Sequence, residues 1–331
     1  MNRHRYFGLC LWAFLLTGCV DAAGQTLAAI RQQVPDGYDF WLYTADDTAS
    51  EPQPIVIFLH GASLCGNNLE RVRRYGPLHA LQMGLEIPAN IVAPQNPGGA
   101  WRPEKILHVL QWVEEHYPID TNRVYVFGMS LGGYGTFDFA GTYPDKVAAA
   151  IAMCGGSQLR DFCGLNEVPL WIIHGTADRQ VPISQSMRII QAMERCGATK
   201  RMQFTRLQGA GHGAPARAFY LTTPYEWLLS HRMDTPLRPV TPGYDITSTD
   251  MRDAYSRLRK GAGRIRVKDE GTKPHPQTAT TDKADVYYTV RKGDSLSRIA
   301  ARKHTTVTAL CRLNGLKRDS VIRPGQRLKV R

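Results

Sequence analysis

Outside its first twenty residues the sequence has no apolar run long enough to cross a bilayer, and the apolar stretch at 6–16 is itself too short to span one. No histidine and cysteine spacing is typical of a metal site. No motif is typical of base recognition, and no row of aromatic residues offers a stacking platform for nucleic acid. These absences argue against a membrane-spanning protein, a metalloprotein and a nucleic-acid-binding protein.

Acidic residues are scarce at the C-terminal end of the chain. Residues 286–331 contain twelve Lys or Arg and two Asp or Glu, whereas residues 1–234 contain nineteen and twenty. The net charge of +12 is therefore mainly a property of the C-terminal segment. A basic segment favours partners such as acidic glycans, peptide carboxylates or anionic envelope surfaces.

The N-terminus is typical of an export signal. Arg3 and Arg5 precede the apolar stretch, which ends in the lipobox-like sequence Leu16-Thr17-Gly18-Cys19. We expect residues 1–19 to be a lipoprotein signal peptide, Cys19 to be lipidated, and the protein to face the periplasm from the outer membrane. Ordinary cleavage near 22–25, which would leave a soluble periplasmic protein, is the alternative.

Cysteine usage leaves the disulfide pairing open. Five cysteines lie outside the export signal, and an exported protein can form disulfides. Cys154 and Cys163 bracket the short loop 155–157, so these two are candidates for a bond. Because five is odd, at least one thiol should remain reduced or pair between molecules.

A glycine-flanked serine is the most informative motif. Gly128-Met129-Ser130-Leu131-Gly132 follows the apolar run 124–127, which predicts a strand, a sharp turn with Ser130 at its apex, and a helix behind it. This is the pattern of a nucleophile elbow, in which the flanking glycines let strand and helix approach closely. We therefore expect Ser130 to be a catalytic nucleophile.

A serine nucleophile needs an acid and a base downstream of it. Asp178 follows the apolar strand-like run 170–173, and His212 lies in a small-residue loop after the strand-like run 202–205. We expect His212 to take the Ser130 proton and Asp178 to orient His212. Asp145 and Asp161 compete with Asp178 for this role, although the sequence around Asp145 is typical of a helix end.

Acyl transfer also needs donors for the oxyanion. The Leu131 amide is the first candidate, and the Ala62 amide, just past the apolar run 55–59, is the second, with Ser63 next.

His60 and His174 each close an apolar run in a His-Gly pair, and we interpret both as structural or loop-orienting. Trp101 either lines the substrate pocket or packs its own loop.

Short apolar runs alternate with helical patterns through the first two thirds of the chain. The runs at 55–59, 91–93 and 147–153 are typical of buried parallel strands, whereas 106–116 and 183–195 show helical spacing. This alternation predicts an α/β protein with a doubly wound, mostly parallel sheet.

Residues 35–234 resemble the esterase branch of the α/β-hydrolase superfamily. They are similar to the dienelactone hydrolase, feruloyl esterase and polyhydroxybutyrate depolymerase-like group and to peptidase relatives of the prolyl oligopeptidases. The resemblance implies ester hydrolysis through an acyl-enzyme, without a metal or organic cofactor, and leaves the acyl group open. The motifs that carry it are Phe58 to Ala62, Ala93 to Gln95, Gly128 to Gly133, His174 to Asp178 with Val181-Pro182, and Gly211 to Gly213.

Residues 286–331 resemble a LysM domain, from Tyr287 to Ala300, through Asn314-Gly315-Leu316, to Ile322 to Val330. The pattern predicts a βααβ unit, with Asp294 or Ser295 capping the first helix and the second helix stopping near Gly315. The resemblance implies binding of peptidoglycan or another N-acetylglucosamine-containing glycan. The glycan-binding candidates are Gly293, Asp294, Ser295, Leu296, Asn314, Gly315 and Leu316.

The sequence thus predicts a spacer at 20–34, a hydrolase domain at 35–234, a Pro- and Thr-rich extended linker at 235–285, and a glycan-binding domain at 286–331. We expect an envelope-anchored serine esterase. A prolyl-oligopeptidase-like peptidase that acts on short peptides is one alternative. A glycan-binding envelope protein with an inactive hydrolase domain is the other.

Overall fold

The computed structural model describes residues 24–197, 201–256, 258, 266–268, 287–291, 294–303, 307–316 and 320–330. The chain forms two compact units, which divide between residues 275 and 276. Within the described ranges, no helix is long and apolar enough to cross a membrane. Cys19 and Gly293, predicted for lipidation and glycan binding, lie outside these ranges.

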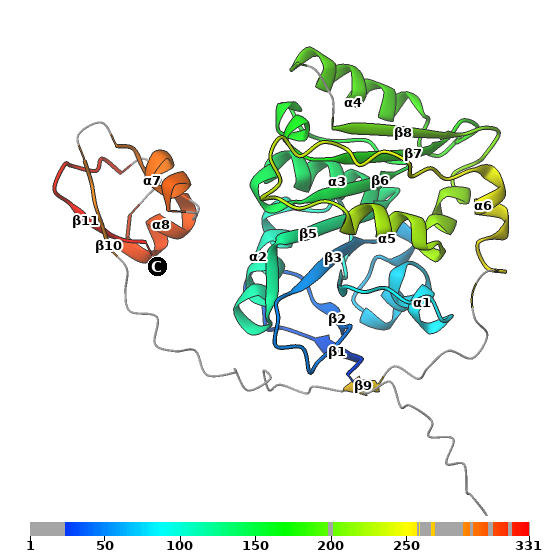
Figure 1. The fold of residues 1–331 in the computed structure, drawn as a ribbon, viewed down its shortest axis with the longest axis horizontal. Coiled ribbons are helices and arrows are strands. Elements are labelled where there is room, and N and C mark those ends of the chain that lie inside the picture. The colour runs from blue at the N-terminus through cyan, green and yellow to red at the C-terminus, as the bar shows by residue number, and fades with distance from the viewer. Residues whose placement is uncertain are drawn as a thin grey trace, which may run out of the picture. The chain divides into compact units, whose positions relative to one another are not determined.

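In its described residues, the first unit is built on a nine-stranded sheet of order β8-β7-β6-β5-β3-β4-β2-β1-β9 (Figure 1). The strands from β8 to β4 in this order are parallel, and β2 runs antiparallel to both of its neighbours. The strands are β1 (Thr26–Ile30), β2 (Phe40–Thr44), β3 (Gln53–Leu59), β4 (Asn90–Pro94), β5 (Ile119–Met129), β6 (Ala149–Met153), β7 (Leu170–Gly175), β8 (Met202–Leu207) and β9 (Arg266–Lys268).

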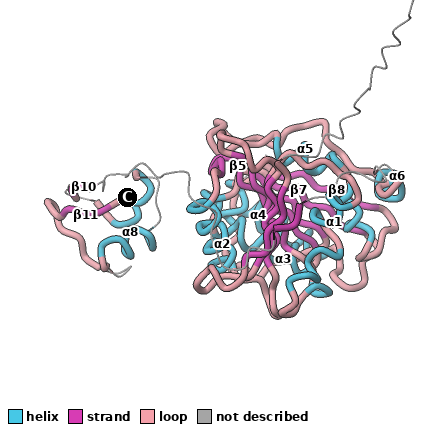
Figure 2. The backbone as a smooth tube through the Cα atoms, turned by 90° about the horizontal axis from the view of Figure 1, so that it is seen from below, coloured by secondary structure: helices cyan, strands magenta, loops and turns pink. Residues whose placement is uncertain are grey.

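Helices cover both faces of this sheet (Figures 1 and 2). Along β3, Val56 and Phe58 pack into one core cluster with α1 and α5, whereas Ile55, Ile57 and Leu59 pack into the other with α2, α3 and α4. The helices are α1 (Pro77–Gln82), α2 (Pro103–His116), α3 (Leu131–Thr142), α4 (Ser184–Arg195), α5 (Thr222–Leu229) and α6 (Ser248–Asp253), with 3-10 turns η1 (Ala62–Leu64), η2 (Leu69–Arg74), η3 (Pro144–Lys146), η4 (Cys163–Glu167) and η5 (Ala214–Tyr220).

The doubly wound, mostly parallel sheet predicted from the sequence is confirmed. Strands that are buried on both faces need apolar side chains on both, which is why their sequences form continuous apolar runs instead of alternating ones. The central strand β3 has β4 on one side and β5 on the other, so the chain reverses direction across the sheet at this point. Such a reversal opens a crevice at the carboxyl ends of the strands, where α/β proteins bind ligands.

Two predicted domain boundaries were wrong. The expected spacer at 20–34 contains β1, a buried strand that pairs with β2 in full register. The expected extended linker begins with an ordered segment, because Ile246, Met251 and Ala254 are buried in the same core cluster as α5. Both errors have one cause: short elements that add to an existing core need few apolar residues and give a weak periodic signal.

The candidate disulfide between Cys154 and Cys163 was also wrong. Cys163 bonds Cys196, and this bond joins η4 to the residue that follows α4. Cys154 is instead buried beside Asp178 and His174. Closeness in sequence suggested the wrong partner, because the helix between residues 163 and 196 returns the chain to the same place.

The second unit has the predicted βααβ order. Strands β10 (Tyr287–Thr289) and β11 (Arg327–Lys329) pair antiparallel, and α7 (Leu296–Arg302) and α8 (Val307–Asn314) pack on them. The Ser295 hydroxyl accepts a hydrogen bond from the Arg298 amide at 3.3 Å and so caps α7. Gly315, with φ of +62°, ends α8 in the left-handed conformation that glycine favours.

We expect the Cys163–Cys196 bond to stabilise the first unit, because it closes a loop with a sequence separation of 33. Replacing both cysteines by alanine should lower the free energy of unfolding by about 3 kcal/mol. Urea titration followed by tryptophan fluorescence measures this change. Cys65→Ala, which removes a thiol outside the disulfide, is the control and should cost less than about 1 kcal/mol. An unchanged urea midpoint in the double variant would contradict the expectation.

Candidate active site

Ser130 lies at a strained turn between β5 and α3. Its φ of +57° and ψ of −121° are unusual for a residue with a side chain. The turn is held by hydrogen bonds from the Ser130 amide to Met153 O at 2.8 Å and from the Tyr134 amide to Ser130 O at 3.0 Å. These bonds fix the serine backbone to the neighbouring strand and to the first turn of α3.

The glycines around Ser130 make this turn possible. A Cβ atom at Gly132 would overlap the carbonyl oxygen of Leu59 in β3, and one at Gly128 would overlap the carbonyl oxygen of Gly132. Both obstacles are backbone atoms, which cannot move aside as a side chain can. The start of α3 therefore lies against the sheet at a distance that only glycine permits.

Two loops at the carboxyl edge of the sheet place Asp178 and His212 side by side. Asp178 follows β7 and His212 follows β8, and these strands are neighbours. The loops are joined by hydrogen bonds from the Ala177 amide to Ala210 O at 3.0 Å and from the Gly209 amide to the Thr176 hydroxyl at 2.8 Å. The two residues therefore meet although 34 positions separate them.

Ser130, His212 and Asp178 form one hydrogen-bonded chain. The distance from Ser130 Oγ to His212 Nε2 is 2.9 Å, and that from His212 Nδ1 to Asp178 Oδ2 is 2.7 Å. A carboxylate can only accept, so Nδ1 carries the proton and Nε2 accepts from the Ser130 hydroxyl. The three residues that the sequence selected are thus in the arrangement that acyl transfer requires.

The surroundings of Asp178 keep its carboxyl group ionised. Burial acts to raise its pKa, but hydrogen bonds from His212 and from the Val181 and Gln180 amides outweigh burial, so the pKa lies below its ordinary value. The two amides bind Oδ1, each at 2.9 Å, which leaves Oδ2 to face His212. The competing acids lie elsewhere: Asp161 is exposed and accepts the Cys163 amide, and Asp145 is exposed in η3.

The predicted oxyanion donors lie next to the serine. Leu131 is the first residue of α3, where helix amides have no partner within the helix. Ala62 begins η1, and a Cβ atom placed on the preceding Gly61 would lie 3.4 Å from Ser130 Cβ. The Gly61 amide itself donates to the Tyr75 hydroxyl at 2.6 Å. Tyr75 therefore holds the backbone just before Ala62.

The structure favours the packing interpretation of Trp101. Its side chain is 2% exposed, and the indole N–H donates to His60 O at 3.1 Å. The ring also borders a cavity of about 340 Å³, which it shares with Arg102, Asp138 and Gln158 but with no member of the Ser130–His212–Asp178 chain.

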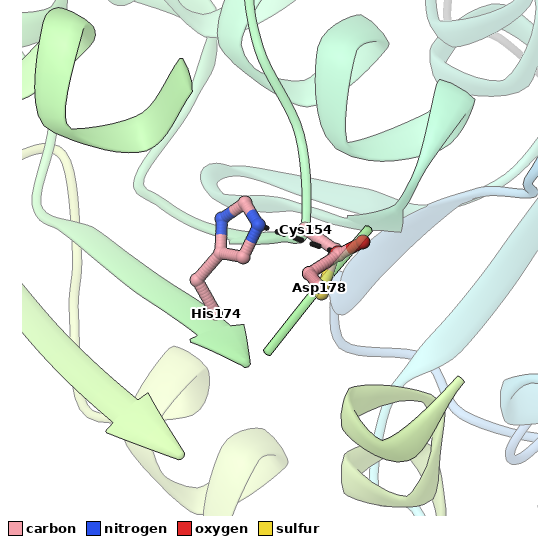
Figure 3. A group of neighbouring side chains, drawn as sticks. All are labelled: Cys154, His174 and Asp178. Atoms are coloured by element: carbon pink, nitrogen blue, oxygen red, sulfur yellow. Dashed lines mark ion pairs between the residues drawn. The ribbon is translucent and has the colours of Figure 1, made fainter. Parts of the chain in front are cut away.

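Both strand-ending histidines are buried, and burial lowers the pKa of each, that of His60 to about 4. His60 fits its predicted structural role, since its Nε2 accepts a hydrogen bond from the Asn96 amide at 3.1 Å. His174 lies within 3.3 Å of Asp178, and Figure 3 shows its ring facing that carboxylate, with Cys154 beside them.

Among the residues that the structure describes, two clusters have the composition of a metal site. In the group of Cys154, His174 and Asp178, each ring nitrogen of His174 already has a hydrogen-bond partner and the pKa of the thiol is raised by burial, so the group fits a hydrogen-bond network better than a metal. The other group contains Cys163 and Cys196, whose sulfur atoms are joined in the disulfide and cannot act as thiolates.

Several predicted glycan-binding residues support the fold of the second unit. Leu296 is 6% exposed and packs in its core. The Asn314 side chain bonds Leu310 O, Lys329 O and the Lys329 amide, each at 2.7 Å, and so joins α8 to β11. Asp294 accepts from the Arg291 amide and the Tyr288 hydroxyl, each at 2.8 Å.

The comparisons with known proteins agree with this architecture. Residues 101–219 match the dienelactone hydrolase family, and residues 288–331 match the LysM domain. The chain thus contains a hydrolase domain of the dienelactone hydrolase family, with an α/β-hydrolase fold, and a C-terminal LysM domain.

Individual relatives cover only parts of the chain. Acetylxylan esterase A of Aspergillus awamori is 25% identical over 193 residues, which are 52% of this chain and 62% of that protein. The N-acetylmuramoyl-L-alanine amidase sle1 of Staphylococcus epidermidis is 50% identical over 52 residues, 16% of each chain. The crystal structure of a thermostable esterase is similar with a TM-score of 0.49 and 24% identity over 59% of each chain. The chain therefore spans less than two thirds of the length of each.

The sequence analysis did not predict the contact of Tyr75 with Gly61 or that of Cys154 with Asp178 and His174. Tyr75 lies in an irregular segment after η2, and Cys154 directly follows β6 with φ of +47°. Neither residue belongs to a motif, and each reaches the site only through the packing of the sheet and its loops. The sequence signal nearest to these residues was the His-Gly pair at 174–175, which marked His174 as a structural or loop-orienting residue.

We expect Gly132→Ala to destabilise the first unit severely, because the new methyl group would overlap a backbone oxygen. The free energy of unfolding should fall by about 3 kcal/mol or more. Gly213→Ala is the matched control: an added Cβ there meets nothing within 4 Å and φ is −77°, so it should cost less than about 1 kcal/mol. Urea titration of both variants makes the comparison, and equal midpoints would disprove the proposed close approach of α3.

Proposed function

We propose that the first unit is a serine esterase that acts through an acyl-enzyme. Ser130 Oγ attacks the carbonyl carbon of a carboxylic ester while its proton passes to His212 Nε2. His212 then gives this proton to the leaving alkoxide, and the acyl group remains on Ser130. Water attacks the acyl-enzyme in the second half of the cycle, with His212 again as the base. The chemistry uses no cofactor.

The hydrogen-bonded chain of Ser130, His212 and Asp178 carries this proposal. The ionised Asp178 stabilises the imidazolium that forms when His212 takes the proton. The Leu131 and Ala62 amides are the proposed donors to the oxyanion, and the N-terminus of α3 adds a favourable dipole there. The strained backbone of Ser130 presents the hydroxyl at this position before any substrate binds.

The proposed substrate is an ester of a small acyl group on a carbohydrate or hydroxy-acid polymer. The dienelactone hydrolase family match and the acetylxylan esterase among the relatives support ester hydrolysis. Acetyl groups on wall glycans belong to this class, and a glycan-binding module on the same chain would raise their local concentration. Short peptides are the alternative substrate.

We further propose that the second unit binds peptidoglycan and that Cys19 attaches the protein to a membrane. The LysM domain match supports the first statement, and the twelve basic residues of 286–331 favour an anionic wall polymer. The lipobox-like sequence that ends at Cys19 is the support for the second. Both features support the proposal that the esterase acts in the cell envelope.

We expect Ser130→Ala to abolish hydrolysis of a p-nitrophenyl ester series, from acetyl to longer acyl chains. The loss in kcat should be at least about 1,000-fold, because no other group can form the acyl-enzyme. A fluorophosphonate probe should label the wild type and not the variant. Aminoacyl amides, assayed in parallel, test the peptidase alternative.

Each outcome of this experiment separates one function from the others. Ester turnover that depends on Ser130 supports the proposal, and faster amide turnover would favour the peptidase. A wild-type protein that neither turns over nor binds the probe would be an inactive hydrolase domain on a glycan-binding protein.

We expect insoluble peptidoglycan to retain the full chain and to release a chain that ends at residue 285. Ser130→Ala in the full chain is the control and should be retained like the wild type, since the two units are compact on their own. Sedimentation at several salt concentrations measures the bound fraction. Equal retention of the truncated chain would rule out the second unit as the anchor.

A further inference from the structure

We propose that His174 is a positioning residue for Asp178, and that Ser186 sets the tautomer in which His174 acts. This inference rests on the proposed function, because it concerns the acid of the same hydrogen-bonded chain. His174 lies in β7 at the edge where the site is built, and its side chain is fully buried. Asp178 lies one loop further along.

The contacts of the ring fix the position of its proton. Nε2 faces two acceptors, Val181 O at 2.8 Å and Asp178 Oδ2 at 3.3 Å. Neither oxygen can donate, so Nε2 must carry the hydrogen. Burial lowers the pKa of His174, which keeps the ring neutral and leaves Nδ1 as an acceptor. Ser186 Oγ, at 2.8 Å from Nδ1, is then the donor.

This assignment connects five residues. Ser186 in α4 donates to His174 Nδ1, and His174 Nε2 donates to Val181 O while it lies 3.3 Å from Asp178 Oδ2. Asp178 accepts from His212, which accepts from Ser130. A fully buried donor in a helix thus holds, through one ring, the carboxylate on which the base depends.

His174 also holds the loop that carries Asp178. Val181 accepts from His174 through its carbonyl and donates its amide to Asp178 Oδ1 at 2.9 Å. Two hydrogen bonds and the 3.3 Å contact between Nε2 and Oδ2 therefore close a small cycle through the ring, the Val181 peptide groups and the carboxylate. Without His174, Val181 O would lose its donor and Oδ2 would lose a polar neighbour in a buried place, and the carboxylate could rotate away from His212.

The loss should appear in catalysis more than in substrate binding. Oδ2 is the atom that orients His212, and a small displacement of a catalytic group lowers the rate strongly. His174 is fully buried behind Asp178, so it does not contact a substrate bound at Ser130. We therefore expect kcat to fall while KM stays constant.

Four variants test the proposal with the ester assay and a thermal unfolding curve. His174→Phe keeps the ring but removes both hydrogen bonds, and kcat should fall about 10- to 100-fold at unchanged KM. His174→Gln restores an N–H donor near Nε2, and kcat should return to within about fivefold of the wild type. Ser186→Ala removes only the donor to Nδ1 and should lower kcat less than His174→Phe does.

His231→Phe is the matched control. His231 is also buried, and its pKa is also lowered by burial. Its ring nitrogens bond Trp227 O at 2.7 Å and the Thr241 amide at 3.1 Å, and neither bond involves Ser130, His212 or Asp178. This variant should lose thermal stability but keep kcat within about twofold. If His174→Phe behaves in the same way, His174 is only structural and the proposal is wrong.

A second measurement does not depend on activity. Long-range ¹H–¹⁵N spectra of histidine side chains at neutral pH report which ring nitrogen carries the proton. The His174 resonances, assigned by their loss in His174→Gln, should show a neutral ring with the proton on Nε2. A proton on Nδ1, or a charged ring, would overturn the assignment even if His174→Phe cannot be obtained folded. An inactive wild type with the expected tautomer would instead disprove the proposed function.

Discussion

The approach of α3 to the sheet at Gly132 is the constraint on which the rest of the site depends. The helix starts so close to β3 that a Cβ atom at Gly132 would overlap Leu59 O, and Ser130, the residue just before the helix, has a positive φ. The strained turn lifts the serine hydroxyl above the sheet edge and places the first amide of α3 beside it. The cost of the strain is offset by the two cores that the sheet buries on its faces.

Asp178 and His212 depend on a different kind of contact, which is the pairing of two loops. Backbone hydrogen bonds tie the loop after β7 to the loop after β8, and the carboxylate of Asp178 accepts hydrogen bonds from His212, Gln180 and Val181. Because these donors together outweigh the effect of burial on the pKa, the acid stays ionised in an enclosed place. An ionised and fixed carboxylate is what a histidine base requires.

Much of this arrangement could be predicted because it rests on local patterns. The glycines around Ser130 reflect the close approach of helix and strand, and the continuous apolar runs of β3 and β6 reflect burial on both faces of the sheet. The turn at Ser130 and the sheet were therefore predicted correctly. The partner of Cys163, the contribution of Tyr75 and the place of β1 in the sheet could not be predicted. Each is a contact between distant segments, and its residues fit many other arrangements equally well.

The sequence by itself determined the class of the fold, the chain order of Ser130, Asp178 and His212, and the βααβ pattern of the second unit, because backbone sterics and hydrophobic periodicity act over a few residues. The tertiary structure alone decided that Asp178 and not Asp161 faces His212, and that a second buried histidine stands behind that acid. Those choices follow from how loops at one sheet edge pack against each other. Packing selects among residues that are chemically equivalent when they are considered one at a time.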